Sequence, residues 1–357
     1  MTRRLLSDTD GLIEAIGLCL PRGLEHRELM AAHRGLLRQL PAEIAVTLAT
    51  PPEHVSAVSS WLDRQHQGRH AVVAAGEELD EHAIWVQDPV LVTTDRGRRA
   101  YLRVASEYPY PVAHWLAAAD GIGVDRTQLH LSGGNSLVGH NFRFAGADAV
   151  LHDAGRGMPA AIRRAIERHR SLDPRRLHIY GYGETPIAGM PWAQEPFHLD
   201  LALALTGCHT AREHPIVLLA RPQSPSPALD ATAERLAGDG FHVVRVHVPV
   251  QGNSLYGYNN VLVETAVRPG QRRPLVFVPQ YGDRRPSLAR YDRYIAELWS
   301  GLGFTARGVT GWGPFVFAGG AVRCATKVLS RSALSTPERI ISNRTLARLA
   351  RLTPDDC

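Results

Sequence analysis

Cysteine is scarce in this chain of 357 residues, which contains only Cys19, Cys208, Cys324 and Cys357. These four residues have none of the pair spacings of a zinc site. They are also too few to staple a small secreted domain with disulfides. The scarcity therefore excludes a cysteine-ligated zinc centre and a disulfide scaffold, and it predicts a reducing, cytoplasmic setting.

Long apolar runs are missing as well. No segment approaches the roughly 20 apolar residues that a membrane-spanning helix needs. Residues 1–8 carry charge early and contain no apolar signal core. The sequence therefore predicts a soluble, intracellular protein without membrane contact.

The basic residues do not form a block. Almost all of the 40 are arginines, set against 35 acidic residues, and they are scattered along the chain. Nowhere do they interleave with aromatic residues in a nucleic-acid-binding motif. The pattern predicts a solvated arginine-rich surface and no nucleic-acid partner, while the net charge of +5 also suits an acidic partner.

The hydrophobic content of 44% is enough for one large domain or two ordinary ones. In the N-terminal stretch, apolar residues at helical spacing predict two helices over residues 5–40, broken around residues 21–23. The first of them contains Leu12, Ile13, Ile16 and Leu20. We expect an N-terminal helical extension over 1–43 and a polar helical tail over 332–357.

Between these extensions, residues 44–331 repeat a pattern of strand, turn, strand, amphipathic helix and strand. The predicted helices are 53–66, 160–169, 228–237 and 289–302. The predicted strands are 45–48, 70–73, 129–137, 149–151, 177–180, 199–205, 216–219, 243–246, 261–263, 275–278, one after Gly303, and 315–317. Arranged as a ring, such ββαβ units bring the ends of their first strands to one central cleft.

A candidate thiol nucleophile lies near the end of the chain. The apolar run 314–318 breaks into paired glycines at 319 and 320, and Cys324 follows. Glycine lets the backbone approach a substrate closely. His198, Asp200 and Asp88 lie at the ends of distant hydrophobic segments, and in the ring they meet Cys324. One Cys, one His and two Asp suit a thiol-nucleophile site whose carboxylates hold a cation.

Each of these residues also has a structural interpretation. Cys324 alone fits a small buried hydrophobe, and His198 alone fits a hydrogen-bonded core histidine. Asp88 before Pro89 is a common turn pair, and residues 133–135 read naturally as a hairpin turn.

Taken in order, the motifs resemble those of the guanidine-modifying pentein superfamily, which includes arginine, agmatine and peptidylarginine deiminases and amidinotransferases. Residues 85–89 (WVQDP) are similar to its Trp/Phe-x-Arg-Asp element, and residues 132–135 (SGGN) to its Glu-Gly-Gly-Asn/Asp. Residues 198–200 (HLD) match His-x-Asp, and residues 319–326 (GGAVRCAT) are similar to Gly-Gly-x-x-His-Cys-x-Thr. Asn260 with residues 278–281 (VPQY) resembles the fourth module. The resemblance covers about residues 44–331.

The resemblance implies a five-module ββαβ α/β propeller over 44–331 that acts as a cysteine-dependent guanidine deiminase without cofactor or metal. Asp88 and Asp200 would hold the guanidinium, Cys324 would attack its carbon, and His198 would protonate the departing nitrogen and then activate water. The implied substrate-binding residues are Trp85, Gly133, Gly134, Asn135, Asn260 and Gly320. The implied substrate is a small guanidino compound, such as arginine or agmatine, or the arginine side chain of a peptide.

Two other functions share the same residues. An amidinotransferase would resolve the covalent intermediate with an amine, and a catalytically silent protein would bind a guanidino ligand in the same cleft. Both a monomer and a homo-oligomer stay open. Three departures from the family pattern bear on the choice: Ser132 replaces Glu, Gln87 replaces Arg, and Arg323 replaces His. Without that Glu, His198 is a poorer acid unless another carboxylate, such as Glu195, substitutes.

Overall fold

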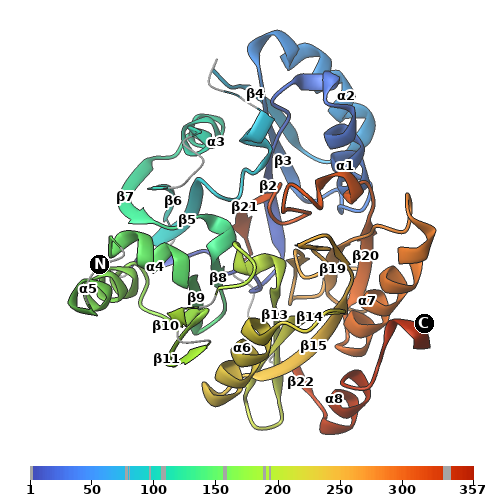
Figure 1. The fold of residues 1–357 in the computed structure, drawn as a ribbon. Helices are drawn as coiled ribbons and strands as arrows, with labels where there is room; N and C mark the ends of the chain where they lie inside the picture. The colour runs from blue at the N-terminus through green and yellow to red at the C-terminus, as the bar shows by residue number, and fades with distance from the viewer. Residues whose placement is uncertain are drawn as a thin grey trace.

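The structure is a computed structural model that describes residues 3–76, 79, 81–95, 98–105, 110–155, 159–187, 190–192, 194–332 and 339–357. These residues form a mixed α/β fold of five sheets with three or four strands each and two small hairpins. Figure 1 shows helices on the outside of the molecule and the sheets between them. No helix in the described ranges is both long and apolar enough to cross a membrane.

One sheet joins the two ends of the chain. Its order is β21-β2-β3-β4, with bounds Lys327–Arg331, Ile13–Cys19, Ala45–Thr50 and His70–Ala74. Strand β2 pairs parallel with β3 and antiparallel with β21. Helices α1 (Arg27–Leu37) and α2 (Val55–Gln65) follow β2 and β3 in the chain. The predicted helix around Leu12 to Leu20 is therefore wrong, because this segment is an interior strand.

The next two sheets run through the first half of the chain. The first has the order β1-β5-β6-β7, with bounds Arg4–Leu5, Val90–Asp95, Arg98–Ala105 and Val124–His130, and α3 (Val112–Asp120) precedes β7. The second has the order β10-β9-β8, with bounds Arg176–Tyr180, Phe142–Gly146 and Ser136–Val138. Helices α4 (Ala147–Asp153) and α5 (Pro159–Ser171) connect β9 to β10. A hairpin follows, β11 (Tyr182–Ile187) with β12 (Met190–Trp192).

The last two sheets form the second half. The first has the order β15-β14-β13-β22, with bounds His242–Val248, Pro215–Pro222, Leu203–Thr210 and Arg339–Ile341, and α6 (Pro227–Gly238) connects β14 to β15. The second has the order β18-β19-β20, with bounds Leu262–Val263, Leu275–Pro279 and Thr305–Val309, and α7 (Ala289–Gly301) connects β19 to β20. A hairpin pairs β16 (Val250–Gln251) with β17 (Ser254–Leu255), and α8 (Asn343–Leu349) lies near the C-terminus.

Short 3-10 turns connect these elements and carry several of the candidate residues. They are η1 (Gly23–Glu25), η2 (Pro52–His54), η3 (Glu81–Ile84), η4 (Gly133–Asn135), η5 (Leu199–Leu201), η6 (Pro286–Leu288), η7 (Gly313–Phe315) and η8 (Pro354–Asp356). Two predicted strands are wrong, since 149–151 lies within α4 and 315–317 lies in η7 and the turn after it. The predicted strand 129–137 is interrupted by η4, and the predicted strand 199–205 begins as η5 before β13. The four helices predicted in the repeats are confirmed as α2, α5, α6 and α7.

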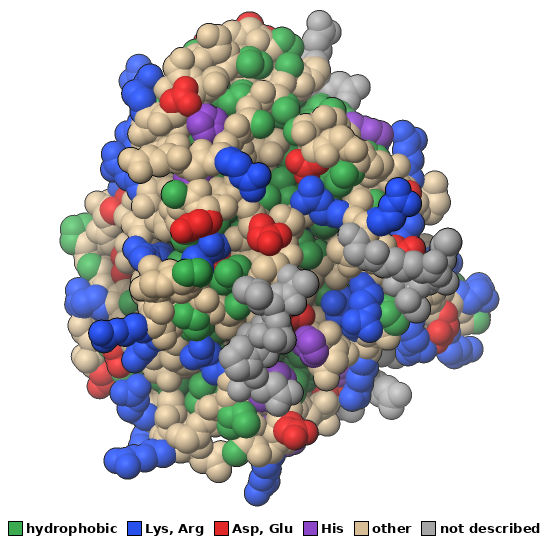
Figure 2. Space-filling model, turned by 180° about the vertical axis from the view of Figure 1, so that it is seen from behind, with side chains coloured by type: hydrophobic (Ala, Val, Ile, Leu, Met, Phe, Trp, Pro, Cys, Tyr) green, Lys and Arg blue, Asp and Glu red, His purple; other side chains and the backbone are tan. Residues whose placement is uncertain are grey.

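The arginine-rich surface is mixed in charge on the face that Figure 2 shows. Lys and Arg side chains are spread over this face among acidic ones and do not gather into a single patch. This distribution agrees with the scattered arginines of the sequence.

Candidate active site

Cys324 lies in the segment between η7 and β21, and its side chain is 2% exposed. The chain reaches it through a tight turn at Gly319, where φ is +69° and any Cβ would lie 2.5 Å from the Phe197 ring. That left-handed backbone and close approach require glycine. The apolar run before the turn packs its Phe315 inward and leaves Phe317 64% exposed, so it bends where an extended strand was expected.

Asn260 orients the cysteine through three hydrogen bonds. Its Nδ2 donates to Cys324 Sγ at 3.0 Å. Its Oδ1 accepts from the backbone N–H groups of Arg323 and Cys324 at 2.8 and 3.1 Å. The residue predicted from sequence to bind substrate thus contacts the candidate nucleophile, and it holds both the thiol and the backbone that carries it.

Asp200 lies directly against this thiol. The carboxylate is fully buried on η5, with Oδ2 3.6 Å from Cys324 Sγ. The same oxygen accepts a hydrogen bond from Arg323 Nη1 at 2.7 Å. One carboxylate therefore contacts both the Cys324 thiol and the Arg323 guanidinium.

His198 and Asp88 form the other side of the cluster. His198 Nε2 lies 2.9 Å from Ser132 Oγ, and its Nδ1 lies 3.8 Å from Asp88 Oδ1. The Gly134 N–H donates to Asp88 Oδ1 at 2.8 Å. A Cβ at Gly134 would lie 2.5 Å from His198 Nδ1, so only glycine allows this approach. The imidazole is thus held between a hydroxyl and a carboxylate.

Burial dominates the electrostatics of the cluster. It raises the pKa of Asp88; the neighbouring Asp200 adds to the rise, and His198 opposes it. Burial, together with the carboxylates of Asp200 and Asp88, raises the pKa of the Cys324 thiol well above its usual value. Both effects disfavour the charged form of a group in a dry, acidic surrounding. These effects favour the protonated form of the Cys324 thiol, although the Arg323 guanidinium beside Asp200 opposes the rise in its pKa.

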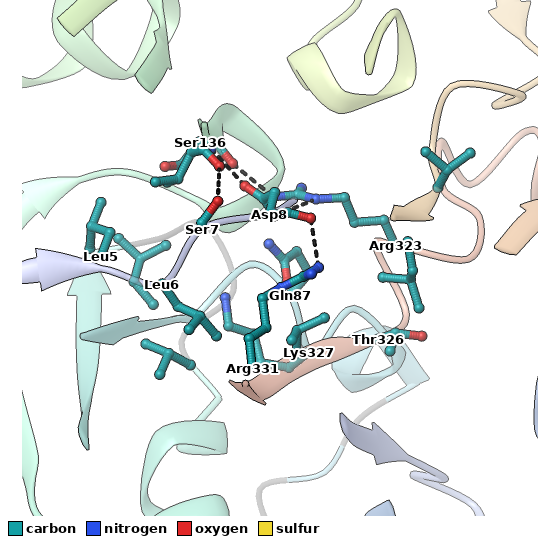
Figure 3. Close-up of a pocket in the computed structure, with 16 residues that line it drawn as sticks. Leu5, Leu6, Ser7, Asp8, Gln87, Ser136, Arg323, Thr326, Lys327 and Arg331 are labelled. Carbon is teal, nitrogen blue, oxygen red and sulfur yellow. Dashed lines mark hydrogen bonds and ion pairs between the residues drawn. The ribbon is translucent and has the colours of Figure 1, made fainter. Parts of the chain in front are cut away.

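Arg323 is the site residue whose contacts the sequence did not indicate. Besides Asp200, its guanidinium donates to Asp8 Oδ1 at 2.9 Å and to the carbonyl oxygens of Gly133 and Ser136 at 3.1 and 2.8 Å. Figure 3 shows it reaching Asp8 across a small cavity. The only signal for this role in the sequence was the replacement of the expected histidine before Cys324. The contact with Asp8 joins positions 315 apart in the chain.

Gln87 lines the same cavity as Arg323. The two positions where the resembled motifs place Arg and His therefore lie at one place in the fold. In this chain, position 87 carries an amide and position 323 carries a guanidinium. A buried cation is therefore present beside the carboxylates, but it comes from the segment of Cys324 and not from the segment of Asp88.

The other predicted residues lie around this centre in supporting positions. Trp85 is buried and covers Gly320, where a Cβ would lie 2.3 Å from the indole. The Gly133 N–H donates to the Asp88 carbonyl at 3.0 Å. Asn135 Oδ1 accepts from the Leu199 N–H at 3.2 Å and so connects η4 to η5. These contacts hold the segments of Asp88, His198 and Asp200 together.

Glu195 does not replace the carboxylate that the family places at position 132. Its Oε2 accepts a hydrogen bond from Ser226 Oγ at 2.6 Å. The same Ser226 oxygen accepts from the Leu229 N–H and caps α6. Ser132 Oγ itself occupies the position beside His198, and it also accepts from the Asn135 N–H at 3.3 Å.

An exposed aromatic ring also borders the site. Phe197 is 47% exposed, and its ring centroid lies 4.4 Å from that of His198. No sequence pattern singled out Phe197, because an aromatic residue beside a motif is more often part of the core.

No protein-family model and no curated protein sequence matches the chain. Among solved structures, the agmatine deiminase of Campylobacter jejuni is similar with a TM-score of 0.62 at 12% identity, over 94% of this chain and 98% of that one. An agmatine deiminase of Enterococcus faecalis has a TM-score of 0.63 at 16% identity, over 93% and 97%. An amidinotransferase from Microseira wollei has a TM-score of 0.49 at 12% identity, over 95% and 99%.

The two agmatine deiminases share the fold of this chain, so the expected resemblance is confirmed at the level of the fold. At 12–16% identity the likeness concerns the fold alone.

Proposed function

We propose that this chain is a cysteine-dependent guanidine deiminase. The observation that carries the proposal is the placement of two buried carboxylates, Asp88 and Asp200, around the Cys324 thiol and His198. A guanidinium is a planar cation with several N–H donors, and two carboxylates hold such a group in a fixed plane. The agmatine deiminase fold supports this choice of substrate.

The charges of the site suggest how the nucleophile becomes active. Asp88 and Asp200 hold the Cys324 thiol in its protonated form. A guanidinium bound between them offsets their charge, so the thiol loses its proton when substrate arrives. We assign His198 as the acceptor of this proton, because it is the imidazole of the cluster and lies 3.8 Å from Asp88.

The reaction then balances in two stages. Cys324 Sγ forms a bond to the guanidinium carbon, and the C–N bond breaks as His198 returns the proton to the departing ammonia. His198 next takes a proton from water, whose oxygen attacks the amidino carbon. The C–S bond breaks, the thiol recovers its proton, and a ureido product leaves.

We further propose that the five sheets are the modules of a propeller, with the site where the sheets meet, and that this propeller includes strands outside the expected range 44–331. The described N-terminal strands β1 and β2 belong to these sheets, so in this arrangement residues 4–19 contribute to the ring. The four cysteines are free thiols, which supports the reducing, cytoplasmic setting.

The proposal is tested by incubating the protein with agmatine and with arginine and measuring ammonia and the ureido product. We expect product from the wild type and none from Cys324→Ala, with substrate binding kept, because only the nucleophile is lost. Cys208→Ala is the matched control. Cys208 is a buried thiol in β13, and burial raises its pKa to about 12.

Other outcomes point to other functions. Transfer of the amidino group to glycine, without ammonia release, would replace the deiminase with an amidinotransferase. Binding of agmatine or arginine without any product would indicate a silent binding protein. Turnover by Cys324→Ala equal to the wild type would remove the cysteine from the mechanism.

A further inference from the structure

A small, partly open cavity lies behind the candidate site, on the far side of Arg323. Its volume is about 30 Å³, and its polar lining comes from Ser7, Asp8, Gln87, Ser136, Arg323, Thr326, Lys327 and Arg331 (Figure 3). This space is enough for one or two water molecules or one monatomic ion. Its back wall is apolar and includes leucine and valine side chains of β5 and the segment around β1.

Lys327 is the single lysine of the whole chain, since the other 39 of the 40 basic residues are arginines. It is 5% exposed, and within the described part of the chain its ammonium forms no hydrogen bond or ion pair. Lys327 and Arg331 lie at i and i+4 in β21, and Figure 3 shows their side chains directed from that strand into the cavity. A buried ammonium without a partner is costly, so a ligand that pairs with it has a strong driving force.

The cavity lining carries more positive charge than its carboxylate can offset. Asp8 is the acidic residue of the lining, and both of its oxygens are engaged. Oδ1 accepts from Arg323 at 2.9 Å, and Oδ2 accepts from the Val138 N–H at 2.7 Å. Arg331 donates to backbone carbonyl groups, such as those of Asp8 and Val263, and these bring no negative charge.

The lining also contains polar atoms that have no hydrogen-bond partner among the described residues. Arg331 Nε and Ser136 Oγ are both buried and have no hydrogen-bond partner. Buried polar atoms without a partner are rare in native proteins, and they often mark an ion or water that belongs there. Together with the Lys327 ammonium, the cavity offers an N–H, an O–H and an N–H₃⁺ group to one small occupant.

The titration behaviour of the two basic side chains agrees with this excess of charge. Burial and the nearby Arg323 lower the pKa of Lys327 to about 7, while Asp8 and Asp88 oppose the change. Burial also lowers the pKa of Arg331, against the attraction of Asp8, Glu264 and Asp10.

We propose that this cavity is a binding site for one small monovalent anion of the size of chloride, held by Lys327 with Arg331 and Ser136. Arginine at position 327 would bring a longer, planar head into this space, whereas an ammonium is a compact point charge. Only Arg323 would separate the anion from Asp200, because the Arg323 side chain lines the cavity and also donates a hydrogen bond to Asp200.

The single lysine makes a direct measurement possible. Protein labelled with carbon-13 at the lysine ε-carbon gives one lysine signal, and its pH titration reports Lys327 alone. We expect chloride to raise the pKa of Lys327 by about one unit or more relative to gluconate at the same ionic strength, as an opposite charge at close range does. An unchanged titration curve would overturn the proposal.

A second measurement locates the ion. Crystals grown in bromide should show an anomalous scattering peak in the cavity, and chloride should raise the melting temperature of the wild type relative to gluconate. Lys327→Met should lose both effects, while Arg170→Met, which removes an exposed positive charge, should keep them. A cavity that holds only water in bromide contradicts the site. A new lysine carbamate signal with labelled bicarbonate, in place of a chloride effect, would assign the space to a covalent modification instead.

Discussion

At the scale of single residues, Arg323 has the largest set of contacts in the site. Its guanidinium offsets part of the negative charge of Asp200 and Asp8, and it donates a hydrogen bond to the Gly133 carbonyl oxygen. The site therefore has less negative charge than two free carboxylates would give. Position 87, where the resembled motif has arginine, carries an amide in the same cavity. Gln87 and Arg323 therefore form a compensating pair, in which the buried cation is supplied by position 323 and not by position 87.

We predict that Arg323→Met destabilises the protein by about 3–5 kcal/mol, since removing one partner leaves buried Asp200 uncompensated. Chemical denaturation measures the loss. The double variant Gln87→Arg with Arg323→His returns the cation to the motif position, and we expect it to recover part of the stability. A double variant no more stable than Arg323→Met would show that the two positions are not exchangeable.

Ser132 makes a second prediction at this scale. A carboxylate in place of its hydroxyl would lie beside His198 Nε2 and favour the protonated imidazole that donates to the leaving nitrogen. We expect Ser132→Glu to raise kcat on agmatine or arginine by roughly tenfold, which is a part of the roughly 10²–10⁴-fold that general acid–base catalysis contributes. Ser132→Gln, of equal size but uncharged, should not. A lower rate with Glu than with Gln would mean that the pocket is adapted to serine.

The state of Cys324 predicts a pH dependence. A carboxylate beside a thiol disfavours the thiolate, so the rate of inactivation by iodoacetamide should keep rising with pH above the usual thiol pKa. Asp200→Asn removes one negative charge and lowers the pKa of the thiol, which moves this rise to lower pH. Rates measured in a background in which Cys19, Cys208 and Cys357 are replaced by alanine report Cys324 alone. Identical pH profiles with and without Asp200 would contradict the assigned cause.

At the scale of elements, the amphipathic helices were the predictable part. The segments of α2, α5, α6 and α7 have apolar residues at helical spacing. This spacing places them on one face of a helix, so it predicts an amphipathic helix. Strand β2 was mistaken for a helix because most of its residues are buried, so its apolar residues do not alternate. The triplet 149–151 is too short to separate strand from helix, and it lies in α4.

The candidate site divides in the same way. The chemistry-bearing residues Cys324, His198, Asp200 and Asp88 were accessible to sequence reasoning because their order and neighbours resemble known motifs. The contacts of Asn260 with the thiol and of Arg323 with Asp8 join segments that are far apart in the chain. Such contacts depend on tertiary packing, which a local sequence pattern does not predict. Ser132 was recognised as a departure, but its direct contact with His198 needed the fold.

Strand β2 itself can be tested. Ile16 is fully buried in it, and Ile16→Ala should cost about 2–4 kcal/mol, as truncation of a core isoleucine does. Glu14→Ala, in the same strand on an exposed position, should change stability by less than about 0.5 kcal/mol. Urea denaturation of both variants measures the difference. If both variants changed stability by equally small amounts, the segment of β2 would be a loosely attached extension and not an interior strand.

At the scale of the whole molecule, both ends of the chain are paired into sheets. Strand β1 pairs with β5, β2 lies between β3 and β21, and β22 near the C-terminus pairs with β13. The segments expected to be appendages therefore contribute strands to the sheets. Asp8, between β1 and β2, binds Arg323, so the N-terminal segment is also part of the wall behind Asp200.

This pairing of the first strands with the last has a consequence for biosynthesis. While the ribosome is still adding the middle of the chain, β2 has no β21 beside it, Asp8 has no Arg323, and Cys324 does not yet exist. The nascent protein therefore carries an open strand edge for most of its synthesis, a state that favours chaperone contact and slow final assembly. It also lacks Cys324 during that time, because Cys324 precedes β21, the strand that completes the sheet around β2.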